Sequence, residues 1–250
     1  MKKTIWLSVI LALLLVATVS CDTDTPPVVT APTSTAPLAT TEPETDIPES
    51  MPPETDPAET DTPYSEGLLF VSNGDGTCTI FGVGMCADRD IIVPPQSPAG
   101  DIVVSIGQAA FQQCYYLRTI QLPDSLTSIG ESAFEYCTAL VSLEIPDSVI
   151  SIGKHAFSAC TALVEITIPH SITTVDEYTF GGCKALTKVT IPDSITLIAP
   201  HSFAYCDNVK VIMFDGTTEQ WNAIPKGTMW SFQQAPSGEV VCTDGTIPLE

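Results

Sequence analysis

The sequence predicts an α/β solenoid of stacked coils, preceded by two segments that do not join its core. Three observations support this prediction: a hydrophobic leader, a Pro- and Thr-rich acidic stretch, and a strict 23-residue period beyond residue 100. The period decides the fold class, because self-similarity at a fixed interval is the sequence signature of repeat architectures.

The first twenty residues are predicted to be a signal peptide. Lys2 and Lys3 precede an uncharged stretch of Ile, Leu, Val and Ala, whose apolar core at residues 5–19 is 15 residues long. A spanning helix needs about 20 apolar residues, so this length favours a cleaved leader over a membrane helix.

The end of this leader resembles a bacterial lipobox. It has Val-Ala-Thr-Val-Ser-Cys at residues 16–21, and in a lipobox the cysteine becomes the first mature residue and carries the lipid. The resemblance implies lipidation of Cys21, with the membrane contacted through this anchor only, since each buried CH₂ of an acyl chain contributes ~0.8 kcal/mol. A conventional signal peptide with an incidental cysteine is the alternative.

Residues 21–66 are predicted to be the lipidated cysteine and a disordered stalk. From residue 22 to residue 66 there are 10 Pro, 11 Thr, 11 Asp or Glu, and no Lys or Arg. Such a segment has too few large apolar side chains to offset an ordering cost of ~1–2 kcal/mol per residue. A phosphorylated or glycosylated Thr/Pro tract is an alternative to a bare spacer.

The net charge of −21 argues against two classes of partner. The stalk contributes about half of this net negative charge, yet residues 67–250 still have 7 basic against 19 acidic groups. Binding to nucleic acid or to an anionic lipid surface needs a basic patch that neutralises phosphates, so neither is expected.

The repeat consists of columns of identical residues that recur with the same period. Leu-x-x-Ile-x-Ile-Pro-x-Ser alternates with Ile-Gly-x-x-Ala-Phe-x-x-Cys. The first pattern predicts a short strand that ends at the Pro, and the second predicts a helical or 3₁₀ turn from which Ala-Phe packs inward. Stacking of coils must stabilise the fold, because one coil cannot bury enough surface alone. The columns are Phe111, Phe134, Phe157, Phe180 and Phe203; Cys114, Cys137, Cys160, Cys183 and Cys206; and Pro123, Pro146, Pro169 and Pro192.

This repeat resembles the 23-residue leucine-rich repeat of the BspA-like, treponemal type, and the resemblance covers about residues 86–214. It implies a right-handed coil with a parallel β-sheet on the concave side. It also implies a bacterial surface protein that binds a protein or glycoprotein ligand, with adhesion as its role and no shared catalytic site.

The two ends depart from the period and are predicted to be caps. Residues 67–105 form an N-terminal cap and an irregular first coil, residues 106–214 form the 23-residue repeats, and residues 215–250 form an irregular C-terminal cap. Apolar alternation around Asn-Gly-Asp-Gly at residues 73–76 predicts a β-hairpin, and the long first coil predicts a loop at residues 96–101.

Two tryptophans lie in the predicted C-terminal cap. Trp221 and Trp230 are expected to seal the last coil by packing, and sugar stacking is the alternative.

The cysteine column could be a disulfide array, a metal site or a row of buried thiols. Coils ~4.8 Å apart place the sulfurs in a line, so three or four cannot converge on one zinc ion. Five cysteines cannot all pair, which favours free thiols that act as small apolar residues and weak donors. Cys78, Cys86 and Cys242, in the caps, are the candidates for oxidation.

The histidines are expected to be structural. His155 and His201 are two coils apart with Tyr178 between them, so they should not share an ion. His170 interrupts a column of aspartates and is interpreted as relieving their repulsion. A catalytic His170 or weak Ca²⁺ binding by the aspartates are the alternatives.

The candidate ligand face consists of the outward positions of the predicted strands, which vary while the inward columns do not. Its residues are Thr119, Gln121, Ser142, Glu144, Glu165, Thr167, Lys188, Thr190, Val211 and Met213. A merely solvated sheet face is the alternative interpretation.

No nucleophile-elbow, zinc-protease, phosphate-loop or EF-hand motif is found, so the sequence predicts neither an enzyme nor a cofactor. The prediction is a lipid-anchored protein of the bacterial cell surface with an unknown protein or glycoprotein ligand. A structural or self-associating surface component and a hydrolase are the alternatives.

Overall fold

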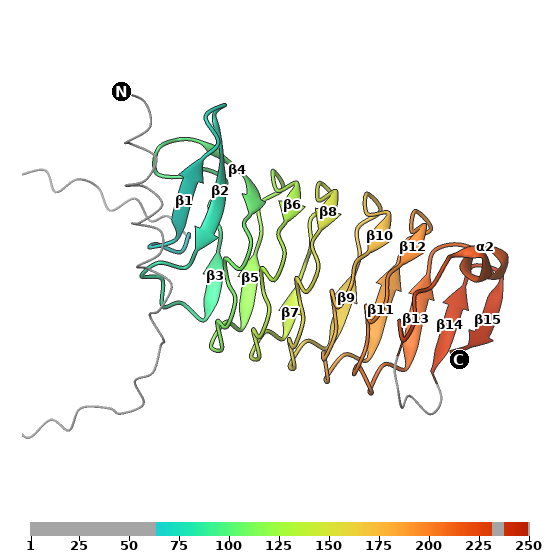
Figure 1. The fold of residues 1–250 in the computed structure, drawn as a ribbon. Helices are drawn as coiled ribbons and strands as arrows, with labels where there is room; N and C mark the ends of the chain where they lie inside the picture. Colours follow the sequence, from blue (N-terminus) through green and yellow to red (C-terminus); the bar gives the residue numbers. More distant parts are fainter. Residues whose placement is uncertain (1–63, 232–237, 250) are drawn as a thin grey trace, which may run out of the picture. The chain divides into compact units, whose positions relative to one another are not determined.

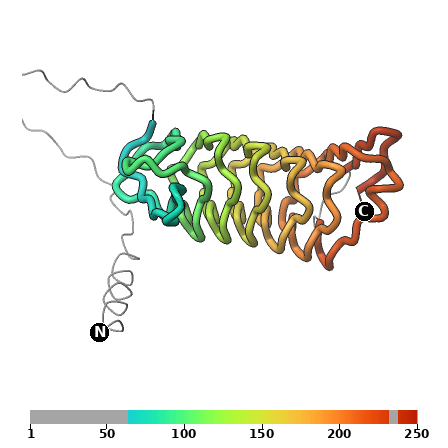
Figure 2. The backbone as a smooth tube through the Cα atoms, turned by 90° about the horizontal axis from the view of Figure 1, so that it is seen from above, coloured from blue at the N-terminus to red at the C-terminus, as the bar shows by residue number. Residues whose placement is uncertain are grey.

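The computed structural model describes residues 64–231 and 238–249. The signal segment, Cys21 and the predicted stalk up to residue 63 lie outside the described residues. The described part is a stack of coils that follow one another in sequence order (Figures 1 and 2), with two rows of short strands along its length. The prediction of a solenoid with parallel β-sheet is confirmed.

We call the first row of strands the front row. Its strands pair in parallel between successive coils, except for the final antiparallel pair of β14 and β15. The row is divided into two sheets, β3-β5-β7 and β9-β11-β13-β14-β15. The strands are β3 (Asp90–Ile92), β5 (Thr119–Gln121), β7 (Ser142–Leu143), β9 (Glu165–Thr167), β11 (Lys188–Ile191), β13 (Val211–Phe214), β14 (Glu239–Cys242) and β15 (Gly245–Pro248).

The second row, the back row, lies on another side of each coil (Figure 1) and was not expected from the sequence. It exists because the Ile of the Ile-Gly motif also pairs with its equivalent in the next coil, as Ile129 does with Ile152. Its two sheets are β1-β2-β4-β6-β8 and β10-β12. The strands are β1 (Leu69–Ser72), β2 (Thr77–Gly82), β4 (Ile102–Ile106), β6 (Ser128–Ile129), β8 (Ser151–Ile152), β10 (Thr174–Val175) and β12 (Leu197–Ile198).

The third side of each coil, the turn side, consists of tight turns. Two residues per turn have left-handed backbone, as in His155 (φ 57°) and Ala159 (φ 58°). Left-handed residues interrupt a right-handed helix, so the turn side does not become helical. Within the described residues the only helix is α2 (Thr218–Ala223) of the C-terminal cap, which begins with a capping box between Thr217 and Gln220.

The core is built from the predicted columns. The five Phe rings of the repeat are fully buried and stack in sequence, with ring centroids 5.1–5.5 Å apart and interplanar angles of 4–8°. Each ring therefore packs on the equivalent ring of the next coil, which couples every coil to its neighbours.

Both ends of the stack are covered. The predicted hairpin is present as antiparallel β1 and β2, closed by a bond from Asn73 N–H to the Thr77 carbonyl (2.8 Å), and the predicted loop in the first coil turns between Ser97 and Asp101.

At the other end, Trp221 is buried, with its ring edge-on to Phe214 and Trp230 at 5.2 and 5.9 Å. The predicted packing role of Trp221 and Trp230 is confirmed, although the cap is more regular than expected, because β14 and β15 continue the front row.

Candidate ligand-binding face

The candidate face lies on the front row, where its side chains form two outward columns. The first contains Glu165, Lys188 and Val211 in register, and the second contains Thr167, Thr190 and Met213. Thr119 and Ser142 are paired in the same way, and Gln121 and Glu144 follow two residues later in their coils. All ten predicted residues are exposed or half-exposed, so the sequence pattern identified accessible side chains along both sheets of the front row.

The N-terminal end of this face includes two charged residues that sequence reasoning missed. Arg118 donates from Nε and from a terminal nitrogen to the two carboxylate oxygens of Asp90, both at 3.1 Å, and the Thr119 hydroxyl donates to the same carboxylate at 2.6 Å. The hydrogen bonds from Arg118 are the main reason that the pKa of Asp90 lies below its usual value. The repeat columns did not predict Asp90 as part of the face, because the irregular first coil places it outside the 23-residue period.

The other end of the face is apolar. Val211 and Met213 are half-buried, and the half-buried Val241 of β14 continues the column of Met213. Val241 was also missed, since residues 215–250 were expected to be irregular. The face therefore changes from polar and acidic at Glu144 to apolar at its C-terminal end.

A cavity of about 300 Å³ lies beside the face. It is lined by Asp124, Glu144, Ile145, Pro146, Asp147 and Ser148. Two of these carboxylates belong to the Asp column that was considered for Ca²⁺. Among the described residues there is no group of three or more His, Cys, Asp or Glu side chains that could hold a metal ion.

The cysteine column is a row of hydrogen-bonded thiols. Sγ of Cys137, Cys160, Cys183 and Cys206 each donates to the carbonyl of the Phe 26 residues earlier, at 3.0–3.2 Å. Burial raises the pKa of Cys160 to about 12 and that of Cys137 further still. None of the eight cysteines in the described part forms a disulfide, and four of the five in the column are buried, as predicted, whereas Cys114 is half-buried. The raised pKa values of Cys137 and Cys160 make these two thiols unsuited to act as thiolate nucleophiles.

The repeat matches a known family. The model of the BspA type leucine rich repeat region matches residues 99–222 with six copies. The chain belongs to the BspA-type leucine-rich repeat family. Proteins of this family are typically exposed at the cell surface and are generally not enzymes.

The solved structures that this BspA-type solenoid resembles include two bacterial leucine-rich repeat proteins. A leucine-rich cell surface protein from Faecalibacterium prausnitzii is 30% identical, with a TM-score of 0.59 over 64% of this chain. The match spans only 41% of that protein's length. A leucine-rich repeat protein from Treponema pallidum is 23% identical, with a TM-score of 0.52 over 64% of this chain and 83% of that one, and supports the fold alone. No curated protein matches the sequence.

The histidines of this BspA-type chain are arranged as structural residues. The rings of His155 and His201 stack on opposite sides of Tyr178, at 5.0 and 4.7 Å, so the two imidazoles are separated by a phenol and do not meet. His170 Nε2 lies 3.8 Å from a carboxylate oxygen of Asp215, and the neighbouring Ser171 hydroxyl donates to the Asp147 carbonyl. This arrangement gives no activated serine beside His170.

A second cavity, of about 330 Å³, lies in the C-terminal cap beside Trp221 and Trp230. The Lys226 ammonium donates to the Trp221 and Ile224 carbonyls at 2.6 and 3.1 Å and lies 4.5 Å from the Trp221 ring centroid. Burial lowers the pKa of Lys226. The Lys226 ammonium and the Trp221 ring therefore make these contacts within the cap, which agrees with a packing role for this region.

No described helix is long and apolar enough to span a membrane.

Proposed function

We propose that this BspA-type protein is a non-catalytic lipoprotein of the bacterial cell surface, anchored through Cys21, whose front row binds a protein or glycoprotein ligand in adhesion. Membership of a surface-protein family supports the location, and the lipobox-like residues 16–21 support the anchor. The solved F. prausnitzii relative is described as a cell surface protein, which agrees with the same location.

The observation that carries the proposal is the contrast between the two sides of the front row. The inward column at Ile166, Val189 and Ile212 is aliphatic and almost fully buried. The outward column one residue earlier in each strand changes from Glu165 to Lys188 to Val211. A scaffold with fixed inward residues and varied outward residues is the arrangement by which repeat proteins recognise partners.

Ligand capture by the full chain on an array of glycans and extracellular-matrix proteins tests the binding role. Once a ligand is captured, charge reversal by Glu144→Lys and Glu165→Lys is expected to weaken binding at least about tenfold, because each change inverts a charge on the face. Glu131→Lys, at an exposed position on the turn side, is the matched control and should leave capture unchanged. Equal capture by all three variants would place the ligand elsewhere on the solenoid.

The anchor is tested separately from binding. Growth with a radiolabelled fatty acid should label the native chain and not Cys21→Ser, which should also lose membrane association. Labelling of the Ser variant, or membrane retention without label, would contradict lipidation at this residue.

Self-association is a second candidate role, favoured by the ends of the stack. Within the described residues β1 pairs only with β2, and β15 pairs only with β14, so each presents a free strand edge. Free edges can pair with another copy of the chain. Sedimentation of residues 67–250 over a range of concentrations separates the roles: a monomer throughout excludes self-association, whereas concentration-dependent assembly supports it.

A further inference from the structure

The stack of coils is interrupted once, in the middle of the repeat. In the front row β7 does not pair with β9, and in the back row β8 does not pair with β10, although each pairs with its other neighbour (Figure 1). Both interruptions fall between the same two coils. We call this place the junction.

Backbone hydrogen bonds are missing on the back side of the junction. The N–H groups of Gly130, Gly153 and Ala199 each donate to a back-row carbonyl of the preceding coil, at 2.8–2.9 Å. In the described structure Asp176, which occupies the same position, makes no such bond. The N–H groups of Ile150 and Thr196 donate to the carbonyls of the equivalent residues in their preceding coils, at 2.9 and 2.8 Å. Within the described residues the N–H of Thr173, at the same position, makes no such bond.

On the front side one backbone bond across the junction is retained, but it is long. The N–H of Val164 donates to the Val141 carbonyl at 3.4 Å. The equivalent bonds donated by Val141 and Thr187, on either side of the junction, are 3.0 and 2.8 Å. The two coils are therefore farther apart here than the neighbouring pairs of coils.

The column of Ser side chains shows that the two coils are also displaced. The hydroxyls of Ser125, Ser148 and Ser194 each donate to a carbonyl 22 residues earlier. Ser171, at the junction, donates instead to the carbonyl of Asp147, 24 residues earlier. The corner of the coil after the junction has therefore shifted along its neighbour.

Core residues next to the junction are more exposed than their equivalents. Leu143 is 8% exposed, against 4% and 2% for Ile120 and Ile166 of its column. Ile152 is 7% exposed, against 2% for Ile129 before it and 2% for Val175 after it. The interruption thus reaches the core on both strand-bearing sides.

The sequence explains why the coils separate here. A Cβ at Gly130 would lie 2.7 Å from Gln108 N, and a Cβ at Gly153 would lie 2.6 Å from Glu131 N, so close packing among the coils before the junction needs Gly at this position. Asp176 is the first residue of the column to bring a Cβ against one of these coils, and its coil lies farther from its predecessor. Ala199 also brings a Cβ, but it packs on the coil of Asp176 and keeps its bond to the Val175 carbonyl at 2.8 Å.

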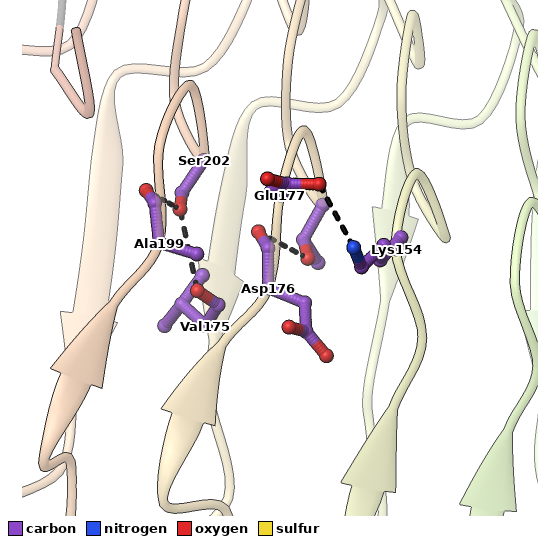
Figure 3. Close-up of polar contacts among 7 residues, drawn as sticks. Lys154, Val175, Asp176, Glu177, Ala199 and Ser202 are labelled. Carbon is purple, nitrogen blue, oxygen red and sulfur yellow. Dashed lines mark hydrogen bonds and ion pairs between the residues drawn. The ribbon is translucent and has the colours of Figure 1, made fainter. Parts of the chain in front are cut away.

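A second change begins at the same coil. In the earlier coils the residue before the buried Phe is alanine, as at Ala156. In the coils after the junction it is Thr179 or Ser202. The Thr179 hydroxyl donates to the Asp176 carbonyl at 2.9 Å. The Ser202 hydroxyl donates to the Ala199 carbonyl at 2.5 Å, a contact drawn in Figure 3. The two kinds of coil therefore meet at the junction.

The turn side remains intact across the junction. The N–H groups of His155, Phe157 and Ala159 donate to carbonyls of the next coil at 2.7–3.0 Å. The Lys154 ammonium also lies 2.9 Å from a Glu177 carboxylate oxygen, as Figure 3 shows. One side of the coil is fully bonded and the two strand-bearing sides have lost their strand pairing, which is the arrangement of a hinge with its axis on the turn side.

We propose that the solenoid consists of two rigid blocks, residues 64–162 and the described residues from 163 onward, which open and close about a hinge on the turn side of the junction. The front row is thereby divided into two half-faces whose relative angle can change. The hinge follows from backbone geometry and does not depend on which ligand, if any, the face binds.

Amide hydrogen exchange on the full chain tests this hinge, because exchange reports local opening segment by segment. Residues 165–176 are expected to exchange at least about tenfold faster than the equivalent residues 119–130 and 188–199, while Phe157 and Ala159 remain protected. Uniform protection of the three segments, or loss of protection on the turn side as well, would overturn the proposal.

Asp176→Gly should restore close packing and slow the exchange of residues 165–176 to within about threefold of residues 188–199. Asp193→Gly, an exposed Asp away from the junction, is the matched control for a general effect of Gly and should leave residues 165–176 unchanged. Equal exchange of residues 165–176 in the two variants would refute Asp176 as the cause.

Gly153→Ala is the reciprocal change and should speed exchange of residues 142–153 about tenfold. If the Gly153→Ala variant fails to fold, hydrogen exchange of the Asp176→Gly variant still tests whether Asp176 separates the coils.

Discussion

Replacing Ala159 by Gly is expected to stabilise the protein, and the reverse change Gly182→Ala is expected to destabilise it. The two residues occupy the same position in adjacent coils, and both have left-handed backbone, with φ of 58° and 77°. A Cβ at Gly182 would lie 3.6 Å from the nearest atoms of Ala159, which is ordinary contact. The effect of either substitution is therefore conformational rather than steric.

The magnitude follows from two opposing contributions. Left-handed backbone destabilises an L residue by about 1–2 kcal/mol, and the greater freedom of Gly in the unfolded chain offsets about 0.5–1 kcal/mol of that. Each substitution should thus change the free energy of unfolding by about 0.5–1 kcal/mol, or the Tm by roughly 1–4 °C for a domain of this size.

Thermal and urea unfolding of the two variants give the measurement. The control is Ala162→Gly, in the same coil but with ordinary backbone, which should destabilise by about 0.5–1 kcal/mol. If Ala159→Gly lowers the stability as much as Ala162→Gly does, the left-handed conformation is not the source of the effect, and the reasoning fails.

Four further outcomes are expected. Phe157→Ala should lower the free energy of unfolding by about 1 kcal/mol more than Phe111→Ala in urea titrations, because the Phe157 ring has stacked Phe neighbours on both sides and Phe111 on one; equal losses would contradict this. Since the pKa of Cys160 is raised to about 12 from an ordinary 9.0, its contribution to stability is present below pH 9 and is lost as the pH rises towards 12. In the native protein iodoacetamide should alkylate the half-buried Cys86 well before Cys160, and comparable rates would argue against a protected thiol. Trp221→Ala should lower stability by about 3–5 kcal/mol, as a loss below about 1 kcal/mol would not fit a residue that seals the last coil.

The columns of the repeat were predictable because each is decided by burial alone. A Phe or Cys that recurs once in every coil must point inward, and the structure places Phe134 and Cys160 fully inside. The outward positions Glu165 and Lys188 followed from strand alternation, and the hairpin followed from its Asn-Gly-Asp-Gly turn.

What was missed depends on contacts between coils rather than on the pattern within one. Asp176 follows Gly130 and Gly153 in its column and resembles an ordinary surface substitution until the distance from Gly153 to the preceding coil is known. The second row of strands, and the addition of β14 to β13, likewise depend on which backbone groups meet across the stack. The left-handed backbone of the turns could not be predicted from the sequence. Such backbone is usually recognised from Gly, whereas here it occurs at His155 and Tyr178.

The spacing of the thiol bonds has a consequence for how such a chain can change in length. Each Sγ reaches a carbonyl 26 residues earlier, and the stacked Phe rings are one repeat period apart, so the same offsets connect every coil to the one before it. An insertion of one or two residues within a coil would change the offset of every donor–acceptor pair that spans it, and would put that coil out of step with its neighbours. A whole coil, added or removed between two matching coils, leaves all offsets intact, and the solenoid can lengthen or shorten in units of a complete coil while both caps keep their contacts.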